Sequence, residues 1–418
     1  MFDIHKMQQR MPDIKQSVTD VVNAGYDLDY VSDSLLSVLN VRPDGTIGSK
    51  GDTRHRAVIV PSVKMMQPQS LKRLLDLARE GATVIFTGSL PADVPGLGHL
   101  DARRESFGKI AAELPDFTVT PSVHQFGKGK LIYAPTVTEG LAMTGVTPEP
   151  GREAGLSMIR RRNEAGGHNY FMSLLCDRTV DGWIDLAVPA GSAMIFDPLT
   201  GRKGKAQMRA TADGNASVRL QVRPGESLLL KTFPGDVTAE PWKYVESKGT
   251  PLVLAEGWTL TFPESEPAVA DTFAIGRPVD WTTLDDPRLQ VNAATGRYAV
   301  EFTMPEGVDA SDWELSLGNL RESARVRVNG QDAGTVWSVP YPLNIGSLLK
   351  PGLNRMEIDV TNLQANRIRD YEKRGVKWRR FKDTNINSVT GARQFSFGDW
   401  PVTPSGLTTE VTLTPVKY

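Results

Sequence analysis

The hydrophobic pattern of this 418-residue chain changes its period near residue 156, and this change constrains the fold more than any other feature. Before it, helical patterns alternate with short, fully apolar segments, for example residues 67–80 followed by residues 83–87. That alternation is typical of a parallel sheet covered by helices on both faces. After it, apolar and polar residues alternate with a period of two, as expected for antiparallel strands with one buried face. The sequence therefore predicts an α/β region followed by all-β regions.

Residues 1–150 are predicted to form a truncated, doubly wound α/β domain. One helix is expected near residues 11–25 and another over residues 67–80, where Gly81 would end it. The expected strands are residues 30–31, 57–60, 83–87 and 130–133. A doubly wound domain normally opens on a central strand, whereas this one opens on a helix, so we expect its first strand to be missing. The missing strand would leave an open groove in the middle of the sheet, beside unpaired backbone groups.

The remainder of the chain is predicted to be β-rich and divided into three segments. The 38 glycines and 28 prolines of the whole chain favour many turns over long helices. Residues 151–235 are expected to form a small antiparallel β-domain, residues 236–252 a linker, and residues 253–418 a β-sandwich. Asn329 and Gly330 are a strong signal for a two-residue hairpin within the sandwich.

Several tryptophans are expected to fill the core of the sandwich. Trp313 leads an alternating run with Leu315 and Leu317, so its side chain should point to the same inner face. Its replacement by alanine would then cost roughly 3–5 kcal/mol, the range for deleting a buried large aromatic side chain.

The composition excludes several classes of function. With 48 Lys and Arg against 49 Asp and Glu, the chain lacks the basic excess typical of a nucleic-acid-binding protein. No apolar run approaches the roughly 18 residues of a membrane-spanning helix. The single cysteine, Cys176, excludes an intrachain disulfide, and its apolar surroundings predict a buried side chain rather than a nucleophile. The five histidines are scattered without metal-ligand spacing, and no Gly-x-Ser-x-Gly nucleophile motif is present.

Carboxylates remain as candidates for chemistry in the α/β region. Asp27, Asp29 and Asp33 cluster around the strand expected at residues 30–31, and doubly wound sheets bind ligands at the carboxyl ends of their strands. Asp33 also suits the N-cap of a short helix. We favour a structural role for these aspartates over a catalytic one, because two carboxylates that act on a glycoside must lie on either side of the sugar. Asp27 and Asp29 are retained as candidate substrate-binding residues.

The last third of the chain carries a resemblance to known glycosidases. Residues 313–362 resemble the galactose-binding-like β-sandwich of β-galactosidase-type enzymes. They include the segments WELSLGNLRESARVRVNGQDAGTVWSVPYPLNI and LLKPGLNRMEIDVTN. Two further segments, residues 366–370 (NRIRD) and 400–407 (WPVTPSGL), resemble the C-terminus of the α-L-rhamnosidases of glycoside hydrolase family 106. Upstream segments that occur in the same order in these enzymes are residues 25–33, 81–86 and 197–201.

This resemblance implies the C-terminal portion of a larger enzyme. Members of the family cleave terminal α-L-rhamnose with inversion, using two glutamates on an N-terminal (β/α)₈ barrel and, in known cases, calcium. No residue of this sequence matches those glutamates, so the resemblance implies no catalytic residue and no metal or cofactor site in this chain. It does imply calcium for the complete enzyme, the missing barrel as a partner, and an amidotransferase-like fold for residues 1–150. The N-terminus shows no secretory signal, and the parent enzyme is expected to be periplasmic or secreted.

Two residues are the candidates for sugar binding in the sandwich. Trp337 and Tyr341, with Pro340, would form an aromatic face on which a pyranose ring stacks; in the alternative they seal the sandwich against a neighbouring domain. The chain is thus predicted to be a non-catalytic portion of a glycoside hydrolase acting on terminal α-L-rhamnose in plant or microbial polysaccharides. The first alternative is a stand-alone carbohydrate-binding protein. The second, an amidotransferase-like enzyme, is disfavoured because Gly-Ser-Leu at residues 88–90 stands where a cysteine nucleophile would follow the strand.

Overall fold

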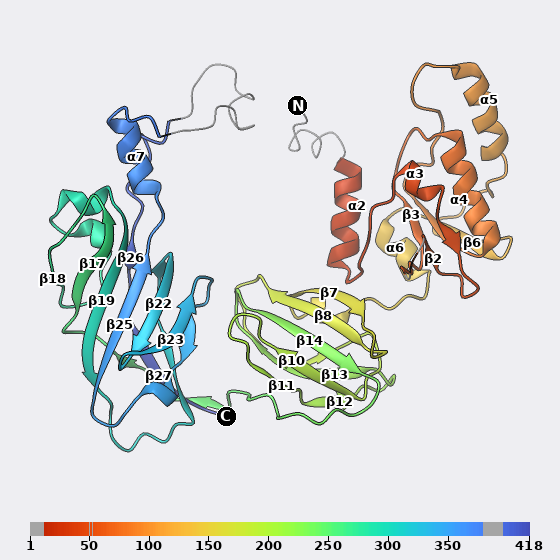
Figure 1. Cartoon of the computed structure of the whole chain (residues 1–418). Coiled ribbons are helices and arrows are strands. Elements are labelled where there is room, and N and C mark those ends of the chain that lie inside the picture. The colour runs from red at the N-terminus through yellow and green to blue at the C-terminus, as the bar shows by residue number, and fades with distance from the viewer. Residues whose placement is uncertain (1–11, 50, 52, 379–395) are drawn as a thin grey trace. The chain divides into compact units, whose positions relative to one another are not determined.

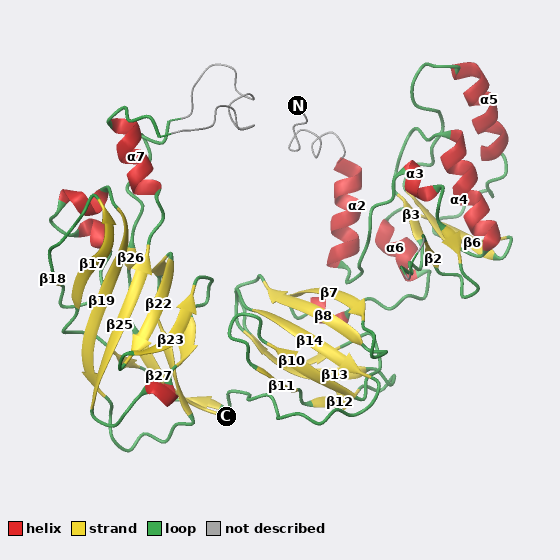
Figure 2. Cartoon of the chain, in the orientation of Figure 1, coloured by secondary structure: helices red, strands yellow, loops and turns green. Residues whose placement is uncertain are grey.

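The computed structural model describes residues 12–49, 51, 53–378 and 396–418. The chain divides into two compact units, which can be followed along the colour gradient of Figure 1. Unit 1 comprises the described residues up to 175 together with residues 180–222 and 227–242. Unit 2 comprises residues 176–179 and 223–226 and the described residues from 243 onward. Strands outnumber helices in both units, so the fold is β-rich (Figure 2).

The α/β region of unit 1 is built on a four-stranded sheet. Its strands, in spatial order, are β3 (Val58–Val60), β4 (Thr83–Thr87), β6 (Gly129–Ala134) and β5 (Ser122–Phe126). The first three run parallel, and β5 pairs antiparallel with β6. The helices are α2 (Pro12–Asn23), α3 (Asp33–Leu36), α4 (Pro68–Glu80), α5 (Leu100–Ala111) and α6 (Val137–Ala142). A ribbon of β1 (Asn40–Val41) and β2 (Ile47–Gly48) precedes β3.

Alternate residues of β4 pack against two different layers of helices, because successive side chains of a strand face opposite sides. Val84 and Phe86 share a buried apolar core with Leu71 and other residues of α4. Ile85 belongs to a second core, together with Val21 of α2 and residues of α6. The sheet therefore carries helices on both faces (Figure 2).

Two predictions for this region are wrong and one is confirmed. Residues 30–31 form no strand: Tyr30 is 73% exposed, and the chain enters α3 directly afterwards with Ser32 as the N-cap. The four strands pair without interruption, so the described part of the sheet has no groove in its middle. The helix expected over residues 67–80 is present, and Gly81 ends it with a φ of +129°.

The β-rich region of unit 1 contains two antiparallel sheets. The first has the order β11 (Lys203–Lys205), β10 (Ser192–Phe196), β14 (Ser227–Phe233), β8 (His168–Leu174), β7 (Leu156–Arg162). The second has the order β12 (Met208–Ala210), β13 (Ala216–Val222), β9 (Val180–Asp185), and the 3₁₀ turn η1 (Pro150–Arg152) precedes β7.

Cys176 lies just after β8, half-buried, and its thiol donates to the carbonyl of Arg178 at 3.7 Å. The predicted burial of Cys176 in an apolar strand is wrong, because the strand ends at Leu174.

Unit 2 is a sandwich of two antiparallel sheets. One has the order β18 (Phe273–Ala274), β17 (Thr259–Glu266), β19 (Ala293–Thr303), β25 (Leu353–Thr361), β22 (Ser323–Val328), β23 (Gln331–Val336). The other has the order β15 (Ser247–Lys248), β27 (Thr412–Lys417), β20 (Asp312–Ser316), β24 (Pro342–Asn344), and β16 (Leu252–Val253) also pairs with β27. The smaller elements are β21 (Leu320–Arg321), β26 (Gly406–Leu407), α7 (Ala365–Lys373), η2 (Trp281–Thr283), η3 (Pro287–Gln290) and η4 (Gly346–Leu348). One cluster of buried side chains draws on both sheets, including Ile358 of β25 and Leu413 of β27.

The hairpin prediction for the sandwich is confirmed, and the tryptophan prediction is partly wrong. Asn329 and Gly330, at φ +52° and +79°, connect β22 to β23 as a two-residue turn. Trp313 packs against the same core as the fully buried Leu315 and Leu317, but its own side chain is only half-buried. The reason is that the core ends at Trp313, where a hollow opens in the surface.

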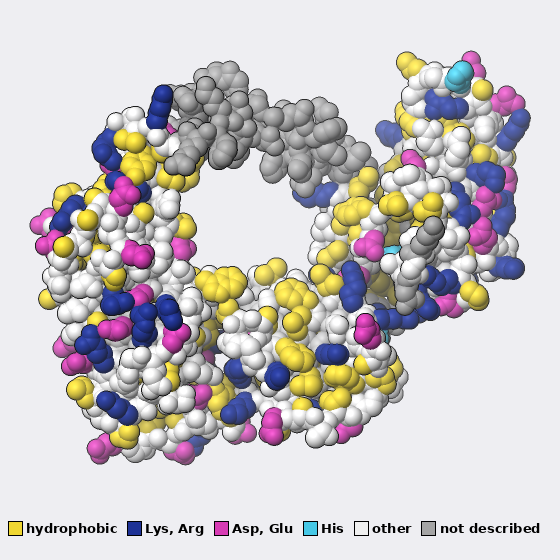
Figure 3. Space-filling model, in the orientation of Figure 1, with side chains coloured by type: hydrophobic (Ala, Val, Ile, Leu, Met, Phe, Trp, Pro, Cys, Tyr) yellow, Lys and Arg dark blue, Asp and Glu magenta, His cyan; other side chains and the backbone are white. Residues whose placement is uncertain are grey.

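The surface of the described chain is mixed in charge. On the face shown in Figure 3, basic and acidic side chains are interspersed. Many charged side chains of the described residues form ion pairs; for example, Arg327 pairs with Asp359 at 2.7 Å on the outside of the six-stranded sheet. Within the described residues, no helix combines the length and apolar character needed to cross a membrane.

Candidate functional site

A hollow of about 490 Å³ opens in unit 2 beside Trp313, and we call it the Trp313 hollow. One side is formed by residues 247–252. The other lining residues are Pro305, Val308, Asp309, Trp313, Pro415 and Lys417. Its volume falls in the range of small-molecule sites, roughly 300–1,000 Å³. The hollow is therefore large enough to hold a small organic ligand.

The side formed by residues 247–252 is held rigidly against β27. Leu252 pairs with Leu413, and the backbone N–H of Gly249 donates to the carbonyl of Pro415 at 2.9 Å. A methyl group at Gly249 would lie only 2.7 Å from Cγ of Pro415, so any side chain there would push this side away. The shape of the hollow thus depends on the absence of a side chain at this position.

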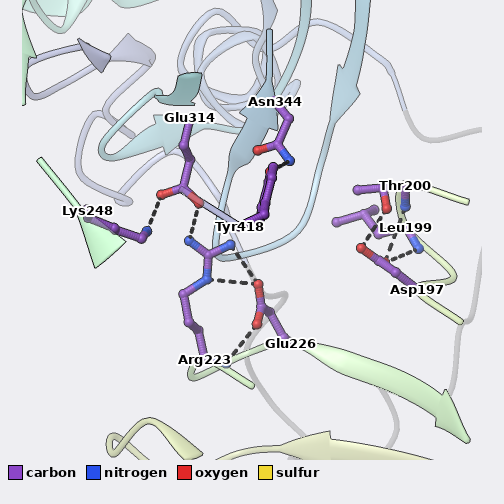
Figure 4. A network of polar contacts seen from close by, with 9 residues as sticks. All are labelled: Asp197, Leu199, Thr200, Arg223, Glu226, Lys248, Glu314, Asn344 and Tyr418. Atoms are coloured by element: carbon purple, nitrogen blue, oxygen red, sulfur yellow. Dashed lines mark hydrogen bonds and ion pairs between the residues drawn. The ribbon is translucent and has the colours of Figure 1, made fainter. Parts of the chain in front are cut away.

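Glu314 joins two cations in a network of ion pairs next to the hollow (Figure 4). Its carboxylate oxygens lie 2.6 Å from Nζ of Lys248 and 2.9 Å from Nη1 of Arg223. Arg223 also pairs with Glu226 at 2.8 Å. Burial opposes the charged form of Arg223, but these two carboxylates outweigh it and raise the pKa of the guanidinium. Neighbouring residues of a strand point to opposite faces of the sheet. The ion pairs of Glu314 therefore lie on one face of β20, and the side chain of Trp313 lies on the other.

Asp197, which Figure 4 also draws, belongs to unit 1 and has a local role. Its carboxylate accepts hydrogen bonds from the N–H of Leu199 at 2.9 Å and from the hydroxyl of Thr200 at 2.6 Å. These contacts stabilise the turn between β10 and β11, in which Gly201 has a φ of +74°. The segment 197–201, one of those that resemble the rhamnosidases, is therefore a structural turn.

The predicted sugar-binding residues Trp337 and Tyr341 differ in their surroundings. Trp337 follows β23 and is 66% exposed. Tyr341 is half-buried and packs against the core of unit 2, and this burial raises the pKa of its hydroxyl. The hollow in the same unit is lined by Trp313 and not by either of these residues. Trp337 therefore offers an open aromatic surface, whereas Tyr341 contributes mainly to packing.

The three aspartates predicted near the first strand have three different partners in unit 1. Asp27 accepts from the backbone N–H of Arg160 at 3.1 Å, and Asp29 lies 3.4 Å from Nε2 of His55. Asp33 accepts from the hydroxyl of Ser70 at 2.6 Å. The prediction that Asp33 caps α3 is wrong, because the side chain of the preceding residue accepts from the N–H of residue 35 instead. Each aspartate thus ties one segment of unit 1 to another.

A buried carboxylate that the sequence analysis did not identify is Glu149. It is 8% exposed, forms an ion pair with Arg160, and accepts from the N–H of Ala187 at 3.1 Å and the hydroxyl of Tyr170 at 3.5 Å. Burial raises its pKa, against the opposing effects of Arg160 and Ala187. Its partners lie 11, 38 and 21 residues away in sequence, so no local pattern points to the cluster.

The raised pKa of Glu149 predicts a pH dependence of stability. Well below its usual pKa of 4.5 the carboxyl is neutral in both states. As the pH rises past 4.5 the unfolded chain ionises it freely, whereas burial opposes its ionisation in the folded protein, so folding becomes less favourable. The free energy of unfolding of the wild type, minus that of Glu149→Gln, should therefore decrease as the pH rises above 4.5. Urea unfolding of both proteins at acidic, neutral and alkaline pH, followed by amide exchange in peptides from β7 and β8 of unit 1, measures this, with Glu164→Gln on an exposed turn as the control. A difference that grows with pH would contradict the expectation.

Buried polar side chains hold residues 400–407, the second segment that resembles the rhamnosidases. Asn362 donates to the hydroxyl of Ser405 at 3.0 Å. Asn366 of α7 exchanges two hydrogen bonds of 2.8 Å with the backbone of Thr403. All three side chains that provide these contacts are at most 9% exposed. Because buried polar groups are costly when unpaired, this network fixes the path of the segment across the sandwich.

Comparison with known proteins relates part of this chain to a known family. Residues 5–210 match the model of a glycoside hydrolase family whose description is α-L-rhamnosidase. The structure superposes on a rhamnosidase from Novosphingobium sp. PP1Y with a TM-score of 0.72 and 22% identity, over 93% of this chain. The chain is rhamnosidase-like, and about half of it matches glycoside hydrolase family 106. The rhamnosidase-like chain nevertheless spans only 36% of the length of that structure.

A second relative comes from the curated proteins. It is described as "Putative beta-glucuronidase" from Formosa agariphila and is 27% identical over 213 residues. The match takes in 49% of the rhamnosidase-like chain and 18% of the relative. The chain therefore covers a minor part of both relatives.

Proposed function

We propose that the rhamnosidase-like chain is the non-catalytic C-terminal portion of a glycoside hydrolase that acts on terminal α-L-rhamnose in plant or microbial polysaccharides. In this role it supports a catalytic barrel outside these 418 residues, and its unit 2 contributes carbohydrate binding. The observation that carries the proposal is the match to the Novosphingobium rhamnosidase, which uses 93% of this chain and 36% of that one. The proposal includes an amidotransferase-like assignment for residues 1–150 and a galactose-binding-like one for residues 253–418.

We propose calcium only for the complete enzyme and not for this chain. Among the residues that the structure describes, no group of three or more His, Cys, Asp or Glu side chains is arranged to hold a metal ion. The described side chains therefore do not fit a calcium site of this kind, and no step is assigned to one. What the described residues supply is two β-rich units, with a ligand-sized hollow in unit 2.

The 418-residue chain is expected not to hydrolyse p-nitrophenyl α-L-rhamnopyranoside. Inverting hydrolysis needs two carboxyl groups roughly 6.5–9.5 Å apart on either side of the sugar, and the proposal assigns both to the barrel. The measurement is nitrophenol release by repurified protein against a heat-treated control. Turnover that persists through repurification would overturn the non-catalytic role.

The alternative of a stand-alone carbohydrate-binding protein makes a different prediction about the gene. Sequencing the transcript that encodes residues 1–418 shows whether an in-frame catalytic region accompanies them. A transcript with a barrel-coding region supports the proposed portion of a hydrolase. A transcript without one, together with glycan binding by the purified chain, supports the alternative.

A further inference from the structure

We propose that the Trp313 hollow is a binding site for a neutral pyranoside. The inference rests on the proposed carbohydrate role and names the site in unit 2 that performs it. The hollow has a volume of about 490 Å³, and an aromatic side chain lies among its lining residues. Trp337, the residue singled out in the sequence, is not part of that lining.

Trp313 provides the surface on which a sugar ring can stack. Its side chain packs partly against the core of unit 2, and it is only half-buried because the hollow takes up the rest. An indole held in this way presents a rigid apolar face at the edge of water, which suits the apolar C–H face of a pyranose. The core contact fixes the ring before a ligand arrives, so little conformational freedom is lost on binding.

The polar groups at the rim favour a neutral ligand over an anion. Lys248 already pairs with Glu314 at 2.6 Å, and Lys417 already pairs with Asp309. Each ammonium group therefore has a carboxylate partner, and a ligand carboxylate would have to compete with it. Sugar hydroxyls need no such exchange, because they can donate to Asp309 and accept from either lysine while both ion pairs persist.

The walls of the hollow are suited to holding one shape. Pro251, Pro305 and Pro415 all line it, and proline fixes the backbone φ angle. Gly249 packs against Pro415 with no room for a side chain. A site whose walls are fixed in advance selects ligands by shape, which supports a ring-shaped ligand over a flexible one.

The test is calorimetric titration of the full chain with methyl α-L-rhamnopyranoside, accompanied by tryptophan fluorescence. Wild type should bind saturably, and Trp313→Ala should weaken binding by up to about tenfold, the loss expected when a stacking partner is deleted. Thr250→Trp, a substitution on an exposed wall residue, should block the hollow and have the same effect without touching the core. Trp337→Ala is the matched control and should bind like wild type.

Other outcomes of the titration overturn the inference. Binding that is lost in Trp337→Ala and kept in Trp313→Ala would move the site to the exposed tryptophan. Tighter binding of methyl β-D-glucopyranosiduronic acid than of the rhamnoside would show an anion site. No saturable binding of either glycoside would dismiss the hollow but leave the non-catalytic role standing, since that role fails only if the chain shows hydrolysis.

Discussion

Replacement of Gly406 by alanine is expected to destabilise unit 2 by roughly 2–5 kcal/mol. The residue has a φ of +96°, a left-handed conformation that costs a residue with a side chain roughly 1–2 kcal/mol. A methyl group at this position would also lie 2.0 Å from Oη of Tyr298 and 2.8 Å from Cε3 of Trp281. Relieving such a contact in a packed core costs roughly 1–3 kcal/mol more. The sum is a large fraction of the stability of an ordinary domain.

A matched glycine separates the two contributions. Gly257 has a φ of +81° and no atom within 4 Å of where a methyl group would lie, so Gly257→Ala should show the conformational cost alone. The chain has two units, so the measurement must report on one of them. Amide exchange in increasing urea, followed in peptides from β19 and β25, isolates unit 2. Equal losses for the two variants would mean that the contact with Tyr298 and Trp281 is relieved without cost.

Trp281→Ala is expected to cost roughly 3–5 kcal/mol, the range for deleting a fully buried large aromatic side chain. Trp281 is 0% exposed and packs edge-to-face with Phe262 at 5.3 Å between ring centroids. Its indole N–H donates to Asn292 at 3.2 Å, and this amide loses a partner when the ring is removed. The same exchange experiment measures the loss. Trp337→Ala, on a side chain that is 66% exposed, should change stability by less than about 0.5 kcal/mol.

The parts of the fold that the sequence predicted are those set by near neighbours in the chain. The helix α4 carries seven buried residues on a regular repeat and ends at a glycine, so its pattern is unambiguous. The Asn329-Gly330 turn has both residues at positive φ, the conformation that this pair favours. The helix α5 was not predicted, and Phe107 is its one fully buried residue, which leaves little apolar pattern to read.

The candidate site was harder to predict because distant segments build it. Trp313 looked like a core residue, since it shares a side of its strand with Leu315 and Leu317. Its partial exposure depends on the segment 247–252 and on β27, which lie more than 60 residues before and about 100 residues after it. Asp27 similarly contacts a backbone group 133 residues away. No periodicity within a short window encodes contacts of this kind.

The position of β27 has a consequence for how unit 2 is made on the ribosome. The six-stranded sheet of the sandwich has all of its strands once residue 361 has been synthesised. The facing sheet does not, because β27 lies between β20 on one side and β15 and β16 on the other. Translation proceeds from the N-terminus, so β15, β16 and β20 emerge without the strand that joins them. The facing sheet of unit 2 therefore cannot be completed until residues 412–417 have left the exit tunnel.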